Sequence, residues 1–322
     1  HAALSRVYND VTKTPGKDTA ASVRNRLLDL ARQRGEDFQL ILTRYGLERL
    51  LYRLSDSEFR DRYILKGAML FALWGDPAHR PTRDVDFLGF GDSGEDAVRD
   101  AFRALCDMPV DEDGLVFHAD SVRVEPIRDV TEYGGMRVTL LGALAGARIP
   151  VQADIGFGDA VTPEPERIAY PTLLDSPAPL LRVYPRETVV SEKFQALVNL
   201  GMANSRMKDF FDIWFMANRF DFDGRTISTA MKNTFERRAT VLPEQTPSGL
   251  SAEFYGDTQK NRQWDAFLRK GMLLSNSTSL SLEEVCGLLE TFLMPPTQAL
   301  VTGHAFMAKS QAGGPWKTAK MG

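Results

Sequence analysis

Residues 65–87 read LKGAMLFALWGDPAHRPTRDVDF, and this stretch decides which fold the chain can adopt. It holds a lysine–glycine step, an apolar run, a Gly-Asp-Pro turn and an Asp-Val-Asp triplet. If residues 84–88 form a strand, Asp84 and Asp86 point to one face, because side chains alternate along a strand. Val85 and Phe87 then point to the other face, into a core. Two neighbouring carboxylates suit a hard cation such as Mg²⁺, and a solvated strand end is the alternative.

The residues around this strand suggest a phosphate-binding environment. A helix is expected over residues 68–74, and it opens at Gly67. Glycine lets a backbone approach a ligand closely, and the start of a helix offers free N–H groups to a phosphate. Arg80 and Arg83 precede the acidic strand, and their planar guanidinium groups suit phosphate oxygens. Surface salt bridges would explain these two arginines equally well.

A third acid lies further along the chain, at Asp154. The pattern of residues 149–155 predicts a strand on which Asp154 is a lone acid among apolar residues. Such a placement costs free energy unless the carboxylate is paired. A cation shared with Asp84 and Asp86 would satisfy it, and so would a buried salt bridge to an arginine.

The composition is typical of a globular protein, with 322 residues of which 43% are hydrophobic and 25% charged. The net charge of −4 makes no overall case for nucleic-acid binding. Residues 86–175, however, hold 18 acidic and 7 basic residues, so the remainder carries a surplus of +7. No apolar run of about 18 residues appears, so no membrane span is expected. Two cysteines fit a reducing cytosol, and we expect a cytoplasmic protein.

Periodicity divides the chain into a mixed first half and a helical second half. Strand patterns occur at 63–65, 84–88, 115–124, 136–143 and 149–155, between helical patterns at 19–34, 37–54 and 93–107. Residues 159–185 contain six prolines and are predicted as a linker. Helical patterns then cover 188–200, 206–218, 225–238, 258–273 and 282–293. These observations predict an α+β fold, in which a mixed β-sheet domain with flanking helices is followed by a helical C-terminal domain.

Four blocks, in this order and at this spacing, resemble the AbiEii/AbiGii-type nucleotidyltransferase toxins of type IV toxin–antitoxin systems. The blocks are Leu65-Lys66-Gly67-Ala68, Arg80 with Thr82-Arg83-Asp84-Val85-Asp86, Ser191-Glu192-Lys193 with Ala196, and Arg206-Met207-Lys208-Asp209 with Phe211-Asp212. The resemblance spans about residues 20–220. In one departure, Ala68 and Met69 follow Gly67 where the family usually has a second small residue and a polar one, so a hydroxyl contact to phosphate is missing.

The resemblance implies a nucleotidyltransferase-like fold and an enzyme. Residues 19–170 would form the catalytic domain and 171–293 a helical domain that completes the active site, between an N-terminal arm (1–18) and a C-terminal tail (294–322). The enzyme would take an NTP with Mg²⁺ (or Mn²⁺) and transfer a nucleotidyl group to an RNA acceptor. In relatives this acceptor is the 3′ end of tRNA, and its extension stops growth. An AbiEi-type antitoxin or repressor is the implied partner.

The resemblance also implies roles for single residues. Asp84, Asp86 and Asp154 would hold the metal, and Asp154 could instead deprotonate the attacking hydroxyl. Lys193 would balance phosphate charge, and Asp209 would orient Lys193 or the nucleotide. Nucleotide contacts would come from Lys66, Gly67, Ala68, Arg80, Arg83 and Asp212.

Two other functions fit the sequence. An enzyme of the same fold that modifies a small molecule, such as an aminoglycoside, would suit the acidic stretch 86–175, which would repel RNA. A non-enzymatic binding module would leave the acids in structural roles. For an RNA acceptor, the expected platform is the basic C-terminal helices. Their cations and interleaved aromatics are Arg225, Lys232, Arg237, Arg238, Lys260, Arg262, Arg269 and Lys270, and Phe235, Tyr255, Trp264 and Phe267.

Overall fold

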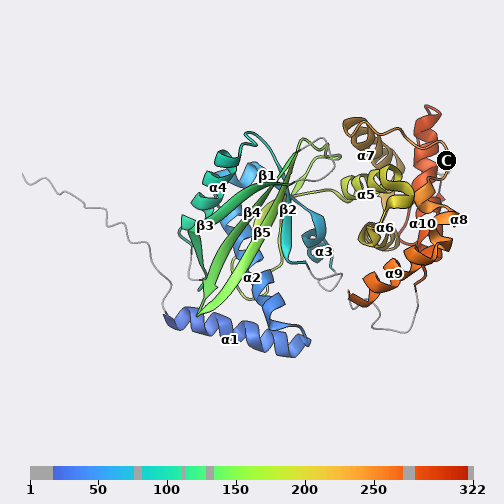
Figure 1. Cartoon of the computed structure of the whole chain (residues 1–322). Coiled ribbons are helices and arrows are strands. Elements are labelled where there is room, and N and C mark those ends of the chain that lie inside the picture. Colours follow the sequence, from blue (N-terminus) through green and yellow to red (C-terminus); the bar gives the residue numbers. More distant parts are fainter. Residues whose placement is uncertain (1–16, 76–81, 111–112, 128–133, 271–279, 318–322) are drawn as a thin grey trace, which may run out of the picture.

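The computed structural model describes residues 17–75, 82–110, 113–127, 134–270 and 280–317. Residues 1–16 of the predicted N-terminal arm therefore lie outside the described part. Two parts are visible in Figure 1, a β-sheet with helices against it and a group of helices that holds the C-terminal half. This arrangement confirms the predicted α+β fold.

Seven strands form one mixed sheet in the order β3-β4-β5-β2-β1-β7-β6. Neighbouring strands are antiparallel except β2 with β5 and β1 with β7, which are parallel. The strands are β1 (Tyr63–Lys66), β2 (Asp84–Gly89), β3 (Val116–Ile127), β4 (Gly135–Leu144), β5 (Ala147–Phe157), β6 (Glu166–Ala169) and β7 (Leu180–Val183).

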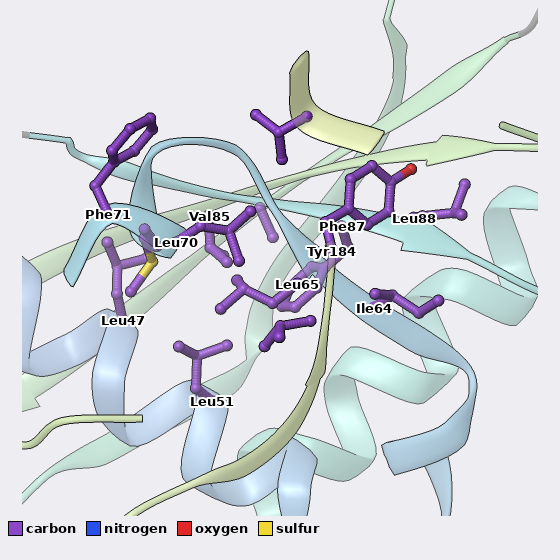
Figure 2. Close-up of a cluster of buried hydrophobic side chains, with 14 of the residues drawn as sticks. Leu47, Leu51, Ile64, Leu65, Leu70, Phe71, Val85, Phe87, Leu88 and Tyr184 are labelled. Atoms are coloured by element: carbon purple, nitrogen blue, oxygen red, sulfur yellow. The ribbon is translucent and has the colours of Figure 1, made fainter. Parts of the chain in front are cut away.

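Helices α2 and α4 pack on one face of this sheet. The helices of the first half are α1 (Lys17–Arg34), α2 (Phe38–Ser55), α3 (Leu70–Leu73) and α4 (Glu95–Asp107), with 3₁₀ turns η1 (Glu58–Asp61) and η2 (Gly67–Met69). Gly46 brings α2 close to β5, since a Cβ atom there would lie 2.7 Å from the Cγ2 atom of Ile149. Figure 2 shows Leu47 and Leu51 of α2 beside Val85 and Phe87 of β2. Val85 and Phe87 are fully buried, so β2 alternates as predicted.

The second half is a bundle of helices around buried aromatic side chains such as Phe235, Phe254 and Trp264. Its helices are α5 (Arg186–Leu200), α6 (Met207–Arg219), α7 (Gly224–Arg237), α8 (Ala252–Gly256), α9 (Thr258–Lys270) and α10 (Leu282–Val301), with 3₁₀ turns η3 (Gly201–Ala203) and η4 (Ser248–Leu250). A small second sheet, β10-β9-β8, joins β8 (Phe222–Asp223), β9 (Lys309–Ser310) and β10 (Trp316–Lys317).

The proline-rich stretch 159–185 is part of the sheet, so its prediction as a linker is wrong. It contains β6 and β7, and β7 pairs with β1 through Leu65 and Val183. The six prolines lie outside both short strands, where a missing N–H group breaks no ladder hydrogen bond. The sheet thus continues past residue 170, and we place the start of the helical part after Val183.

Residues 294–317 continue α10 and add two short strands, whereas their lack of periodicity predicts a frayed tail. Helix α10 continues through Pro295 and Pro296 to Val301. A proline cannot donate to the carbonyl four residues before it, so Pro296 leaves the Phe292 oxygen free of its helical bond. The indole Nε1–H of Trp316 donates to that oxygen at 2.9 Å. The aromatic rings of Trp316 and Phe292 also stack, with centroids 5.6 Å apart. Residues far beyond the helix therefore stabilise it.

A buried ionic network connects α2 to Asp113 and Leu173. Arg53 donates to the Asp113 carboxylate at 2.8 Å, and both side chains are buried. Glu48, also buried, accepts from the backbone N–H of Leu173 at 2.7 Å and lies 3.3 Å from Arg49. Asp113 therefore fixes the end of the loop before β3 to α2.

This network predicts a pH-dependent contribution to stability. Burial raises the pKa of Glu48 from 4.5 to about 7. The folded chain then holds the proton more tightly than the unfolded chain, so the stabilisation is complete below pH 4.5 and is lost as the pH rises through 7. The free energy of unfolding of wild type, minus that of Glu48→Gln, should fall by on the order of 3 kcal/mol over this range. Denaturant titrations at several pH values measure it, and a constant difference would contradict the assignment.

Aromatic side chains join the two parts of the molecule. Phe71 of α3 contacts Phe215 of α6, with ring centroids 5.6 Å apart. Trp74, just after α3, contacts Phe220 at 6.0 Å. Helix α3 follows directly after η2, which begins at Gly67, so this contact fixes α6 close to the Lys66–Gly67 step. Within the described ranges, the structure contains no helix with the length and apolarity needed to cross a membrane.

Candidate active site

A row of charged side chains crosses four neighbouring strands on the face of the sheet opposite α2. Lys66 pairs with Asp86 across β1 and β2, and Asp86 pairs with Asp154 across β2 and β5. Asp154 pairs in turn with Arg137 of β4. Residues paired directly across neighbouring strands point to the same face. The sheet therefore brings together three predicted site residues and adds an arginine that sequence reasoning missed.

Gly67 presses the backbone against the carboxylate of Asp86. Its φ angle is +75°, and a Cβ atom at this position would lie 1.9 Å from Asp86 Oδ2. No side chain can occupy that space, so the position requires glycine both for its conformation and for the close approach. Ala68 follows in η2 and is buried, which agrees with a small residue there.

The two acids of the triplet stand next to each other with unequal surroundings. The hydroxyl of Thr82 donates to Asp84 Oδ1 at 2.6 Å and so fixes that carboxylate. Burial, and then the neighbouring charge of Asp84, raise the pKa of Asp86 above its ordinary value. Lys66 and Lys208 act in the opposite direction. Lys208 belongs to α6, so a charge of the helical part acts on an acid of the sheet.

Asp154 is held by a salt bridge. Arg137 donates from Nε and Nη2 to the two carboxylate oxygens at 2.9 and 2.8 Å, and Gln152 Nε2 lies 3.2 Å from Oδ1. The described residues contain no cluster of three or more histidine, cysteine or acidic side chains arranged to hold a metal ion. In this structure Asp84 and Asp86 share one face of β2, whereas Asp154 contacts the arginine.

Lys193 lies between two buried carboxylates of α6. Its Nζ atom is 2.7 Å from Asp209 Oδ1 and 2.7 Å from Asp212 Oδ2. The other oxygen of Asp209 lies 2.9 Å from Arg206 Nε. Asp212 is fully buried against the lysine, and its contact with a nucleotide, which the family resemblance implies, stays a prediction. The geometry fixes the ammonium group of α5 to the start of α6.

Removal of this ammonium group should have two separable effects. Lys193→Ala leaves two buried acids without it, which should lower the free energy of unfolding by about 3–5 kcal/mol and abolish most of the transfer activity. Lys193→Arg keeps the charge but changes its shape, so it should restore activity only in part. Denaturant unfolding and NTP turnover measure the two effects.

A double variant separates the stability effect from the functional one. Lys193→Met with Asp212→Asn removes one charge of each sign, and Arg206 still neutralises Asp209. This variant should fold more stably than Lys193→Ala and still fail to turn over NTP. Turnover at the wild-type rate would assign Lys193 a purely structural role.

Of the remaining predicted nucleotide contacts, Lys66 is already engaged. Its Nζ atom lies 3.0 Å from Asp159 Oδ2 and 3.4 Å from Glu192 Oε2. Arg83 is exposed at the start of β2, so it is accessible to a ligand. Arg80 lies outside the described residues.

The nucleotidyl transferase AbiEii toxin family, of type IV toxin–antitoxin systems, has a sequence model that matches residues 49–290 of this chain. The chain belongs to this family. The match contains both the sheet-borne acids and the lysine of α5, as well as most of the helical part. The chain is therefore a nucleotidyltransferase by family, which confirms the resemblance drawn from the four sequence blocks.

Two solved structures from Helicobacter pylori are similar to this AbiEii-family chain. One is described as a proposed nucleotidyltransferase, with 15% identity and a TM-score of 0.48, and the alignment covers 84% of this chain and 100% of the other. The second is JHP933, with 16% identity and a TM-score of 0.45, covering 83% and 95% of the two chains. No curated protein matches the sequence.

Sequence reasoning missed four side chains that contact the predicted site. Arg137 gives no signal, because its pairing with Asp154 depends on the register between β4 and β5. Asp159 and Arg238 belong to segments read as a linker and as an RNA platform. Glu192 could have been found, since it precedes Lys193 within a quoted block and is one of the few acids in an apolar helix.

Proposed function

We propose that this AbiEii-family enzyme is a divalent-metal-dependent nucleotidyltransferase whose acceptor is RNA, most specifically the 3′ end of tRNA. The observation that carries the proposal is the pair Asp84 and Asp86 on one face of β2, with Gly67 against Asp86. Family membership supports the reaction class. The metal, the acceptor and the residue roles are our proposal.

The two carboxylates fit a magnesium ion. Mg²⁺ is held by one or two protein carboxylates together with substrate phosphates, so a third acid is not required. The raised pKa of Asp86 reflects like charge and burial that a bound cation would offset. Asp84 and Asp86 would hold Mg²⁺, or Mn²⁺, which supplies charge neutralisation on the phosphate oxygens. Asp154, whose oxygens already accept from Arg137, would join them through its remaining lone pairs.

The chain's own groups would bind and orient the nucleotide around that site. Gly67 places backbone without a side chain directly against Asp86, and Arg83 lies exposed just before β2. Lys193, fixed by Asp209, would place a positive charge against the phosphates from the side of α5. Phosphoryl chemistry of this kind depends mainly on positioning and charge, which these residues supply.

The basic helices need correction as an RNA platform. Arg238 is largely buried in ion pairs, and Lys260 is buried with its Nζ atom 2.8 Å from the carbonyl oxygen of Asn204. Phe235 and Trp264 are core residues and cannot stack on bases. The exposed cations that remain, and that we retain for RNA contact, are Arg225, Lys232, Arg237, Arg262, Arg269 and Lys270.

The proposal is tested by incubating the enzyme with total RNA and each labelled NTP in turn, with Mg²⁺, with Mn²⁺ and with a chelator. Labelled tRNA that disappears with the chelator is the expected result. Labelling should also fall steeply as salt rises, because binding to phosphates releases counterions. Labelling of an aminoglycoside-type molecule but of no RNA would favour the small-molecule acceptor, and the absence of NTP binding would favour a binding module.

The cellular setting follows from the same proposal. The family is defined by type IV toxin–antitoxin systems, which implies an antitoxin partner, and we assign an AbiEi-type protein to that role. An enzyme that consumes NTP and modifies tRNA would act in the cytoplasm. Co-expression with an AbiEi-type protein, and growth measurements after induction of the toxin alone, test this assignment.

A further inference from the structure

Four charged side chains form a closed ring beside the candidate active site. Lys66 lies 3.0 Å from Asp159 and 3.4 Å from Glu192. Arg238 contacts the same two acids, at 3.0 Å to Asp159 Oδ1 and 3.2 Å to Glu192 Oε2. The ring alternates in sign and has no net charge. Between 15% and 22% of each side chain is exposed, so solvent screens these pairs less than it screens pairs on an open surface.

The ring connects the two parts of the molecule. Lys66 ends β1 and Asp159 follows β5, whereas Glu192 lies on α5 and Arg238 follows α7. The contacts Lys66–Glu192 and Asp159–Arg238 therefore both pass between the sheet and the helices. In Figure 1, α5 and α7 lie on the side of the sheet that carries β1 and β2. A further bond crosses here, because Arg237 Nε donates to the carbonyl oxygen of Gly158.

Each end of this connection is next to a predicted site residue. Lys66 precedes Gly67 and lies opposite Asp86, and Glu192 precedes Lys193. A shift of α5 against β1 would move Lys193 away from Asp84 and Asp86. The two acids would keep their own arrangement on the sheet, and Lys193 would keep its own on the helix. An error of about 1 Å in such an arrangement can reduce the rate about 100-fold.

We propose that Glu192, Asp159 and Arg238 are positioning residues for nucleotidyl transfer, which set the place of Lys193 relative to Asp84 and Asp86. This inference rests on the proposed function for its kinetic consequence. The ring holds α5 and α7 against the end of β1. The aromatic contact between Phe71 and Phe215 separately holds α6 against α3. The site between them is thus fixed from two directions.

A paired substitution tests the ring without leaving an unpaired buried charge. Asp159→Asn with Arg238→Gln removes one ion pair between the parts and leaves Lys66 bound to Glu192. The matched control is Glu36→Gln with Arg44→Gln, an ion pair of similar exposure that lies within the sheet part, at 26% and 20%. A third variant, Arg238→Lys, keeps the positive charge of the ring. It should therefore be more active than the paired variant and less active than wild type.

The expected result is a split between the kinetic constants. In the paired variant, kcat for transfer should fall about 10- to 100-fold, while KM for NTP changes less than about threefold, because Gly67, Arg83 and the two acids of β2 are untouched. The control pair should keep both constants. Wild-type kcat in the paired variant would overturn the proposal, and so would losses of kcat that simply follow the unfolded fraction of the protein.

Hydrogen exchange provides a readout that does not depend on transfer. Amides of β1 and of the first turns of α5 should exchange faster in the paired variant than in wild type or the control pair. If wild type transfers no nucleotide to any acceptor, the proposed function fails, and the exchange comparison still decides the ring. Unchanged exchange in both segments would overturn the positioning role.

Discussion

Asp86→Asn is expected to abolish nucleotidyl transfer while leaving the protein at least as stable as wild type. Loss of a group that merely supports a metal ligand costs about 10- to 100-fold, so loss of a ligand itself should cost more than about 100-fold. The stability expectation follows from the pKa of Asp86, which burial and Asp84 raise. The fold thus disfavours the ionised carboxylate at neutral pH, and the neutral amide removes that cost.

Initial rates with labelled NTP and thermal unfolding of the same preparations measure the two expectations. Asp154→Asn is an informative comparison, since Asp154 contacts Arg137 at 2.8 Å and its loss leaves that guanidinium without its carboxylate. We expect Asp154→Asn to be less stable than Asp86→Asn. Transfer near the wild-type rate in Asp86→Asn would remove this residue from the metal site.

Gly67→Ala is expected to have the second largest effect. The added methyl group would lie 1.9 Å from Asp86 Oδ2, so the carboxylate or the backbone must move by more than about 1 Å. The positive φ angle adds a conformational cost of about 1–2 kcal/mol for a residue with a Cβ atom. Transfer should fall at least about 10-fold, and the free energy of unfolding should fall by more than the conformational cost alone.

Gly91→Ala provides the matched control for this substitution. Gly91 has a φ angle of +81°, and a methyl group added there would meet no atom within 4 Å, so the variant measures the conformational cost without a clash. It should lose stability but keep full transfer activity. Equal losses of stability in the two variants, with activity retained in both, would show that Gly67 is needed only for its backbone angle.

Much of the sheet could be predicted because local pattern decides it. The alternation Asp84-Val85-Asp86-Phe87 specifies both a strand and its buried face, and Val85 and Phe87 are indeed buried. The strands β6 and β7 could not be read in this way. Each has four residues between prolines, which is too short for a pattern, and their place depends on the pairing of Val183 with Leu65.

In the candidate site, too, local pattern predicts some residues, and others depend on contacts between distant segments. Asp84 and Asp86 belong to the Asp-Val-Asp triplet, and Gly67 belongs to the lysine–glycine step before it. Their residue types and spacing are therefore enough to identify them. The partners of Lys66 and Asp154 follow from register and from the contact between the two parts, which no local pattern encodes. Arg238 illustrates the difference, because a cation in an amphipathic helix reads as exposed, whereas the loop after β5 brings Asp159 to it at 3.0 Å.

The aromatic contact between α3 and α6 also provides an intrinsic fluorescent probe at the place where the two parts meet. Trp74 lies there, with ring centroids 5.2 Å from Phe71 and 6.0 Å from Phe220. Indole fluorescence responds to the packing and polarity around the ring, and the difference in emission between wild type and Trp74→Phe isolates this one tryptophan. Titration of that difference with NTP, and then with RNA, would reveal in real time whether each ligand alters the way in which the helices meet the sheet.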